Sequence, residues 1–354
     1  MRRKLLTVGL LGLAAASCGN QQSLVKVLGP GVMNDPANRS LRFDLLKFGL
    51  DSFCQEMLER GTALKLSDGQ PTLGRFFADT CSSQVIDEDQ RKSLVVQFAG
   101  KGYAWLGPGI GRVGFRTQSV VEYAPDFLLH EGALYVYFRP RNIDASSFET
   151  LLVESGAAQA AVSLLGLSVP ANQAGARVVK SQLERGFTVI RYGKEGQTEF
   201  GLGYVPKGQK PWQPFRVEFS DKVTLANDRS EVHAAQQDFL GGFRVTSKGQ
   251  ALYLTMSLDG APGVDLEVIS KGYADVMLSR YTGSAGPAQL PGPALFDEAV
   301  VAGQLYKRYV PVPPGIYYLV LDNSAAVGRT PPSAAAGDDR AGKVDYLVQL
   351  GDTP

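Results

Sequence analysis

The chain has 354 residues, of which 44% are hydrophobic and 20% are charged, and this composition is typical of a folded globular protein. It excludes intrinsically disordered and collagen-like chains, and the length predicts two domains. The 36 Lys and Arg residues are almost balanced by 35 Asp and Glu residues, so the chain lacks the excess positive charge with which proteins bind nucleic acid. We therefore expect no nucleic-acid partner.

The first eighteen residues have the pattern of an export signal. A positive segment, Arg2-Arg3-Lys4, precedes an apolar run over residues 5–16. That run is too short to cross a bilayer, which takes about 20 residues. The pattern predicts a cleaved signal peptide over residues 1–17.

The apolar run ends in Ala15-Ala16-Ser17-Cys18. This motif resembles the lipobox of bacterial lipoproteins, in which small residues precede a cysteine whose thiol accepts a diacylglycerol, although Ala15 stands where that family usually has Leu. The resemblance implies that Cys18 carries the lipid anchor and that residues 18–39 form a tether. Gly19, in place of the Asp that retains enterobacterial lipoproteins in the inner membrane, favours the outer membrane, on its periplasmic side or at the surface. The alternative is an ordinary secretory signal in which Cys18 is incidental.

The other two cysteines form an even pair once Cys18 is acylated. Cys54 and Cys81 would then meet in an oxidising compartment, where disulfides persist. A bridge that closes a loop of about 27 residues stabilises a fold by roughly 3–4 kcal/mol. The alternative is a pair of buried, reduced thiols.

Residues 40–205 are predicted to form a mixed α+β domain. Apolar residues at helical spacing predict a first helix over residues 40–60. Ser146 and Glu149 form a capping box, which predicts a second helix over residues 146–165, and a third is expected over about 170–185. The remaining apolar segments predict an antiparallel sheet, with strands at 94–98, 111–116, 119–123, 133–138, 187–192 and 198–205.

Three prolines and a glycine predict a linker over residues 206–215. Beyond it the helical period disappears, and apolar and polar residues alternate. Residues 216–354 are therefore predicted to form an all-β domain, a sandwich or jelly roll. Its clearest predicted strands are 252–258, 264–268, 316–321 and 344–350.

One of these strands carries a second family resemblance. Residues 312–323 read Val-Pro-Pro-Gly-Ile-Tyr-Tyr-Leu-Val-Leu-Asp-Asn. They resemble the P-x-G-x-Y-Y-L-x-V strand of the pre-peptidase C-terminal type of β-sandwich, found on secreted bacterial proteins. Such modules are accessory, so the resemblance implies support of folding, secretion or binding and implies no active site.

The common catalytic motifs do not assemble in this sequence. His130 and His233 are the two histidines, and no Gly-x-Ser-x-Gly turn accompanies them, so a serine hydrolase is not expected. The histidines and cysteines also lack zinc-site spacing. Residues 109–114 match Gly-x-Gly-x-x-Gly, but strand-like sequence follows where a dinucleotide site needs a helix, so we interpret them as a hairpin bend. No cofactor is expected.

Acidic residues offer weak candidates for a metal site. Asp322 ends a predicted strand, and Asp338 and Asp339 follow in a loop, where their oxygens are suited to Ca²⁺. The alternative is that all three are solvated surface charges.

Tyrosines near one predicted hairpin offer a candidate binding face. Tyr306, Tyr309 and Tyr317 lie close together in the sequence, and tyrosine rings stack on sugars and on partner proteins. Strand alternation requires about half of such residues to point into the core instead.

Three functional hypotheses follow from these observations. The first is a non-catalytic envelope lipoprotein that binds another envelope component, a protein or a polysaccharide, as a scaffold. The second is a periplasmic carrier or sensor of a lipidic or carbohydrate ligand, which requires an apolar pocket. The third is a hydrolase that uses two carboxylates alone, which requires two acids to converge in a cleft.

Overall fold

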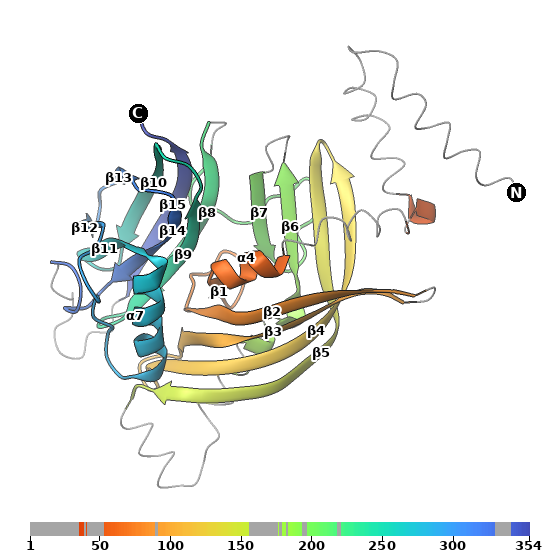
Figure 1. Cartoon of the computed structure of the whole chain (residues 1–354), viewed down its shortest axis with the longest axis horizontal. Helices are drawn as coiled ribbons and strands as arrows, with labels where there is room; N and C mark the ends of the chain where they lie inside the picture. The colour runs from red at the N-terminus through yellow and green to blue at the C-terminus, as the bar shows by residue number, and fades with distance from the viewer. Residues whose placement is uncertain are drawn as a thin grey trace, which may run out of the picture.

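The computed structural model describes residues 35–38, 40, 53–88, 91–155, 176, 179–181, 183–192, 197–217, 221–329 and 341–354. The fold is mostly β, with three antiparallel sheets (Figure 1). The named helices are η2 (Pro36–Asn38), α4 (Phe53–Glu59) and α7 (Lys271–Gly283). Within the described ranges, no helix combines the length and apolar character needed to cross a membrane.

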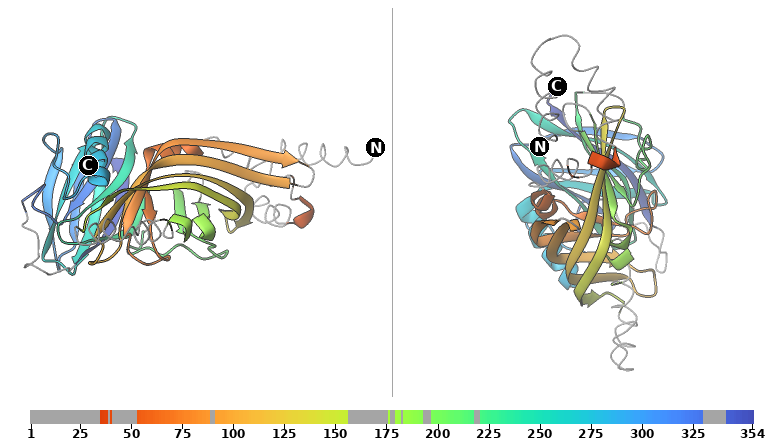
Figure 2. Two further views of the ribbon diagram at one scale, coloured as in Figure 1. Left: turned by 90° about the horizontal axis from the view of Figure 1, so that it is seen from below. Right: turned by 90° about the vertical axis from the view of Figure 1, so that its right-hand side faces the viewer.

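A seven-stranded antiparallel sheet occupies the N-terminal part, with its strands in chain order. It consists of β1 (Thr62–Leu64), β2 (Gly74–Glu88), β3 (Arg91–Trp105), β4 (Arg112–His130), β5 (Ala133–Val153), β6 (Phe187–Tyr192) and β7 (Gln197–Leu202). Register shifts interrupt the pairing of β4 with β5, and such bulges increase the twist of a sheet. The sheet curls, and its long strands extend away from the rest of the molecule (Figure 2).

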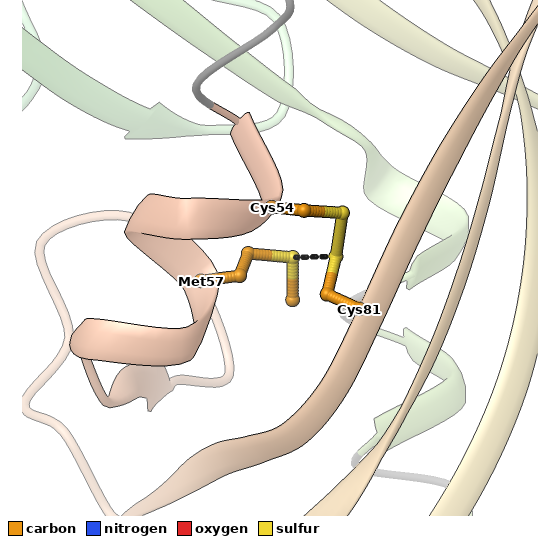
Figure 3. The surroundings of a disulfide bond; sticks show 3 residues. All are labelled: Cys54, Met57 and Cys81. Atoms are coloured by element: carbon orange, nitrogen blue, oxygen red, sulfur yellow. Dashed lines mark hydrogen bonds between the residues drawn. A yellow bond between two sulfur atoms is a disulfide. The ribbon is translucent and has the colours of Figure 1, made fainter.

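Alternation along the strands produces the apolar face toward which the sheet curls. Leu94, Val96 and Phe98 of β3 project to this face and are at most 5% exposed. Helix α4 packs against β2 there, and the Cys54–Cys81 disulfide joins them with an S–S distance of 2.06 Å. The Met57 sulfur lies 3.9 Å from the Cys81 sulfur (Figure 3). The predicted disulfide is therefore present, and the reduced-thiol alternative is wrong.

Several boundaries predicted for the first domain were wrong. Residues 146–153, predicted as the start of a helix, belong to β5. There Glu149 pairs with Arg116 of β4, and the Phe148 ring stacks on the Phe115 ring. Pairing with a long neighbouring strand thus overrides the local capping box. The two strands predicted at 111–116 and 119–123 are parts of a single strand, β4.

The helices predicted over 40–60 and 170–185 are described only in part. The first is helical over Phe53–Glu59, and its earlier residues 41–52 lie outside the described residues. In the second, residues 179–181 and 183–185 are helical, and Val179 and Leu183 pack into the apolar cluster of the curled sheet. The hairpin predicted after it is confirmed as β6 and β7.

The C-terminal part is a sandwich of two four-stranded antiparallel sheets, with strand orders β13-β10-β15-β8 and β12-β11-β14-β9. The strands are β8 (Val223–Val232), β9 (Gln237–Val245), β10 (Gln250–Asp259), β11 (Gly263–Ser270), β12 (Phe296–Val301), β13 (Tyr306–Pro311), β14 (Gly315–Asp322) and β15 (Gly342–Asp352). Alternate residues such as Leu252, Leu254 and Met256 face the core between the sheets. The predicted sandwich strands are confirmed.

Helix α7 was not predicted, although its sequence carries the helical period. Ala274, Met277, Leu278 and Tyr281 are all buried, at the spacing of one helix face. The helix contacts β9, β11 and β14 of the sandwich and also β3, β4 and β5 of the curled sheet. It therefore forms a shared layer between the two parts (Figure 1).

Helix α7 approaches the curled sheet closely at Gly114 of β4. A Cβ atom at this position would lie 1.9 Å from the carbonyl oxygen of Thr282. Only glycine permits that approach, because the opposing atom belongs to the backbone and cannot rotate away.

We expect Gly114→Ala to destabilise the protein by about 1–3 kcal/mol, the usual cost of forcing an extra group into a packed interior. Urea denaturation followed by circular dichroism measures the change. Gly272→Ala on α7 is the matched control, since no atom lies within 4 Å of the added Cβ. The control should be neutral or stabilising by up to about 1 kcal/mol. Equal effects of the two substitutions would contradict the shared-layer interpretation.

Candidate functional site

The curled sheet and the sandwich are joined by a buried ion pair between Arg75 of β2 and Asp238 of β9. Arg75 Nε donates to Asp238 Oδ1 at 2.8 Å, and Arg75 Nη2 donates to Oδ2 at 2.8 Å, which is the bidentate geometry. Each residue is 4% exposed. The hydroxyl groups of Ser230 and Tyr103 also donate to this carboxylate. Asp238 thus accepts hydrogen bonds from Arg75 and Tyr103 of the curled sheet and from Ser230 of the sandwich.

These partners keep Asp238 charged. Burial by itself raises the pKa of a carboxyl group, but the Arg75 guanidinium and the hydrogen bonds from Ser230 and Tyr103 outweigh it. The pKa of Asp238 therefore lies below its ordinary value. Burial and the Asp238 charge raise the pKa of Tyr103, so its hydroxyl stays protonated and donates.

A second polar network links β4 to the segment that follows α7. The Arg112 guanidinium lies 3.6 Å from the centre of the Tyr281 ring of α7. Its Nη2 donates to the carbonyl oxygens of Ser284 and Gly286, at 3.0 and 2.9 Å. Glu154 lies 3.1 Å from the same nitrogen and neutralises its charge. Arg112 therefore holds the end of α7 against the curled sheet.

Aromatic side chains flank the ion pair. The Trp105 and His233 rings are stacked with their centres 4.2 Å apart, one from each part of the molecule. His233 Nε2 lies 3.0 Å from Glu231 Oε1, and the pKa of Glu231 is lowered by this hydrogen bond. Trp212 of the predicted linker has its ring 5.1 Å from the guanidinium of Arg229 on β8. Both tryptophans thus contribute contacts at the junction.

A small cavity lies beside these groups. It has a volume of about 20 Å³ and is lined by residues of both parts, among them Thr72, Gly74, Glu231 and Gln236. That volume accommodates about one water molecule, whereas sites for small organic ligands measure about 300–1,000 Å³. The junction is therefore built to hold two parts together and has no room for an organic substrate.

The structure separates the two histidines considered for catalysis. His130 lies at the end of β4, where its ring is close to Gly208. His233 is stacked on Trp105 at the junction. Gly109 and Gly111 lie in the connection between β3 and β4, as the hairpin interpretation predicted, whereas Gly114 is part of β4.

The three tyrosines of the predicted binding face do not share a surface. Tyr306 and Tyr317 belong to the core cluster of the sandwich and are 9% and 4% exposed. Tyr309 is 50% exposed, and its ring lies 6.0 Å from that of Tyr253 on the outer face. The prediction was therefore wrong for Tyr306 and Tyr317, because strand alternation turns them inward.

The acidic candidates divide in the same way. Asp322 is 1% exposed, and burial raises its pKa to about 6. It lies near Glu267, whose pKa is raised to about 9 by burial and by the neighbouring carboxylates of Asp322, Asp265 and Asp297. Asp338 and Asp339 lie outside the described residues, as does Cys18.

No family model and no curated protein shows a significant match to this chain. Among solved structures, one titled "Structure of infectious bursal disease virus Gt strain" is similar over 81% of this chain and 74% of that chain. Its sequence identity is 10% and its TM-score is 0.21, a likeness too low to support an argument about fold or function.

Sequence reasoning missed the residues that form the junction. Arg75 and Asp238 are 163 positions apart, and each directly precedes two apolar residues, Phe76-Phe77 in β2 and Phe239-Leu240 in β9. A charged residue beside large apolar residues is the signal that was available. It identifies neither the partner nor the opposing strand.

We expect Asp238→Asn to destabilise the protein by about 3–5 kcal/mol, because it leaves the Arg75 charge buried without a counter-charge. Asp275→Asn is the control; it removes an exposed pair with Lys271 on α7 and should cost at most about 0.5 kcal/mol. Thermal unfolding measured by circular dichroism compares the two.

The same variant tests the pH dependence. The pKa of Asp238 is lower in the folded than in the unfolded protein, so its contribution is complete above the unfolded value of about 3.9. It is lost as the pH falls through the lower folded value. Below about pH 4, Asp238→Asn should lose less stability on acidification than the wild type. If the stabilities of the wild type and Asp238→Asn fall in parallel with pH, the Arg75–Asp238 pair is not the acid-sensitive group.

Proposed function

We propose that this chain is a non-catalytic cell-envelope lipoprotein that acts as a binding or scaffold component at the outer membrane. In this proposal residues 1–17 are removed on export, and Cys18 carries acyl chains that hold the protein at the membrane. Residues 18–39 form the tether. The folded part, an α+β unit joined to a β-sandwich, binds another envelope component, a protein or a polysaccharide.

The use of the three cysteines carries this proposal. Cys54 and Cys81 are joined in a disulfide, a bond that is typical of exported proteins. The third cysteine, Cys18, directly follows the apolar run of the export signal, where the lipobox resemblance implies acylation. A single export route therefore accounts for all three cysteines.

The chemistry of the junction supports binding in preference to catalysis. Its titratable groups, Arg75, Asp238 and Tyr103, are occupied by each other in a site that water barely enters. Their geometry fixes the sandwich relative to the curled sheet. A rigid pair of surfaces suits a scaffold, since less freedom is lost when a partner binds.

A second candidate function is a carrier or sensor of a lipidic or carbohydrate ligand. The curvature of the seven-stranded sheet favours it, because apolar residues of β2 to β6 share the face that α4 covers. Mass spectrometry of material extracted from the protein purified from its native envelope tests this function. A stoichiometric lipid or sugar would support the carrier over the scaffold.

We expect Cys18→Ser to move the protein from the membrane to the soluble fraction, because the acyl chains would supply most of its membrane affinity. Fractionation of cells followed by immunoblotting measures the distribution, and intact-mass spectrometry reports the lipid.

The control is the double variant Cys54→Ser/Cys81→Ser, which keeps the lipidated residue. It should remain at the membrane and lose roughly 3–4 kcal/mol of stability. Retention of Cys18→Ser in the membrane fraction would rule out the lipid anchor. Crosslinking of wild-type protein in native envelopes, compared with the soluble variant, then tests whether an envelope partner requires the anchored state.

A further inference from the structure

The outer face of one sandwich sheet carries four acidic residues on three adjacent strands. Asp265 and Glu267 lie two positions apart on β11, so both point to the same face, away from the core residues Val264 and Leu266. Asp265 is directly opposite Asp322 of β14. In a second directly opposed pair, Glu267 faces Asp297 of β12 across the strands.

Residues paired in register on one face have Cβ atoms about 4.5–5.5 Å apart, and diagonal neighbours are within about 8 Å. Glu267 is therefore flanked by the other three carboxylates: Asp265 on its own strand, Asp297 opposite and Asp322 on the diagonal. Carboxylates repel one another at such distances, and nothing in a β-sheet requires this arrangement.

Three of the four carboxylates are buried, and several oxygens of the cluster have no hydrogen-bond partner in the described part of the chain. Asp265 and Glu267 are 0% exposed, and Asp322 is 1% exposed. Both carboxylate oxygens of Glu267 lack a hydrogen-bond partner, as do Asp322 Oδ1 and Asp297 Oδ1. Buried acidic oxygens ordinarily have hydrogen-bond donors or a cation beside them.

Arg329 Nε lies 3.5 Å from Asp297 Oδ2, but the Arg329 side chain is 83% exposed and at the rim. Such an exposed pair compensates little of a buried charge. The buried carboxylate of Asp238 differs from this cluster, because it accepts hydrogen bonds from one guanidinium and two hydroxyl groups.

The segment after β14 covers the cluster closely. The Val327 amide donates to Asp322 Oδ2 at 2.8 Å. Gly328 sits against Asp265, where a Cβ atom would lie 2.2 Å from the Asp265 Cγ. This close cover excludes a bulky organic cation.

We propose that Asp265, Glu267, Asp297 and Asp322 form a Ca²⁺ site that holds the segment after β14 against the sandwich. The donors are all carboxylate oxygens, which Ca²⁺ prefers, whereas Zn²⁺ favours nitrogen and sulfur. Ca²⁺ also accepts irregular geometry with six to eight oxygens, while Mg²⁺ requires a near-ideal octahedron.

Binding requires rotation of side chains. As the side chains stand, no group of three or more acidic, histidine or cysteine side chains in the described ranges is arranged to hold a metal ion. The backbone register already places the Cβ atoms of the other three acids around that of Glu267, and rotation about side-chain bonds would turn the oxygens inward.

Calorimetric titration of the mature protein with CaCl₂, after removal of metal with EGTA, tests the site. We expect one bound ion with a dissociation constant of about 10⁻⁴–10⁻³ M, typical of extracellular modules, and a saturable rise in melting temperature. Glu267→Gln should weaken Ca²⁺ binding at least about tenfold, because even the loss of an outer-shell partner weakens metal binding by about that factor. In EGTA this variant should be as stable as the wild type or more stable, which a purely structural role for Glu267 would not produce.

The matched control is Glu298→Gln on the same strand β12. Its carboxylate faces the other way and accepts hydrogen bonds from Arg308 and Tyr306, so Ca²⁺ affinity should be unchanged. Asp297→Asn, at a side chain that is 32% exposed, provides a second site variant if Glu267→Gln does not fold. Absence of a Ca²⁺ effect on the wild type would overturn the proposal. So would equal stabilisation by MgCl₂, or an unchanged affinity in the folded site variants.

Discussion

The arrangement of this protein depends on one buried interaction, the ion pair between Arg75 and Asp238. Each part of the molecule inserts one charge into the other, and each charge is stable only while the other is present. An apolar contact would tolerate sliding of one part over the other, whereas a bidentate pair fixes both distance and direction. The curled sheet and the sandwich are consequently held as a single body.

Helix α7 extends this constraint over a wider area. It contributes apolar residues to a cluster that includes Tyr103 of the curled sheet and Phe239 of the sandwich. Gly114 permits the helix to approach the sheet backbone, and Arg112 ties down the segment that follows. Burial supplies the free energy in this layer, while the polar contacts select one geometry.

The buried carboxylates of Asp238 and Glu267 have opposite surroundings, and this contrast distinguishes a structural ion pair from a candidate cation site. Asp238 is surrounded by donors and its pKa is lowered, whereas Glu267 is surrounded by other acids and its pKa is raised. The first arrangement stabilises the fold as it stands. In the second, the described residues donate no hydrogen bond to the Glu267 carboxylate oxygens, and we therefore propose a bound cation.

Short-range patterns in the sequence were enough to predict the cysteine pair and the alternating strands of the sandwich, and the structure confirms both. Alternation is reliable there because one face of each strand is buried. Only the tertiary structure decided that residues 146–153 are a strand, and that Arg75 meets Asp238. Those outcomes depend on pairing between distant segments, and the free energy of such contacts overrides local signals such as the capping box at Ser146.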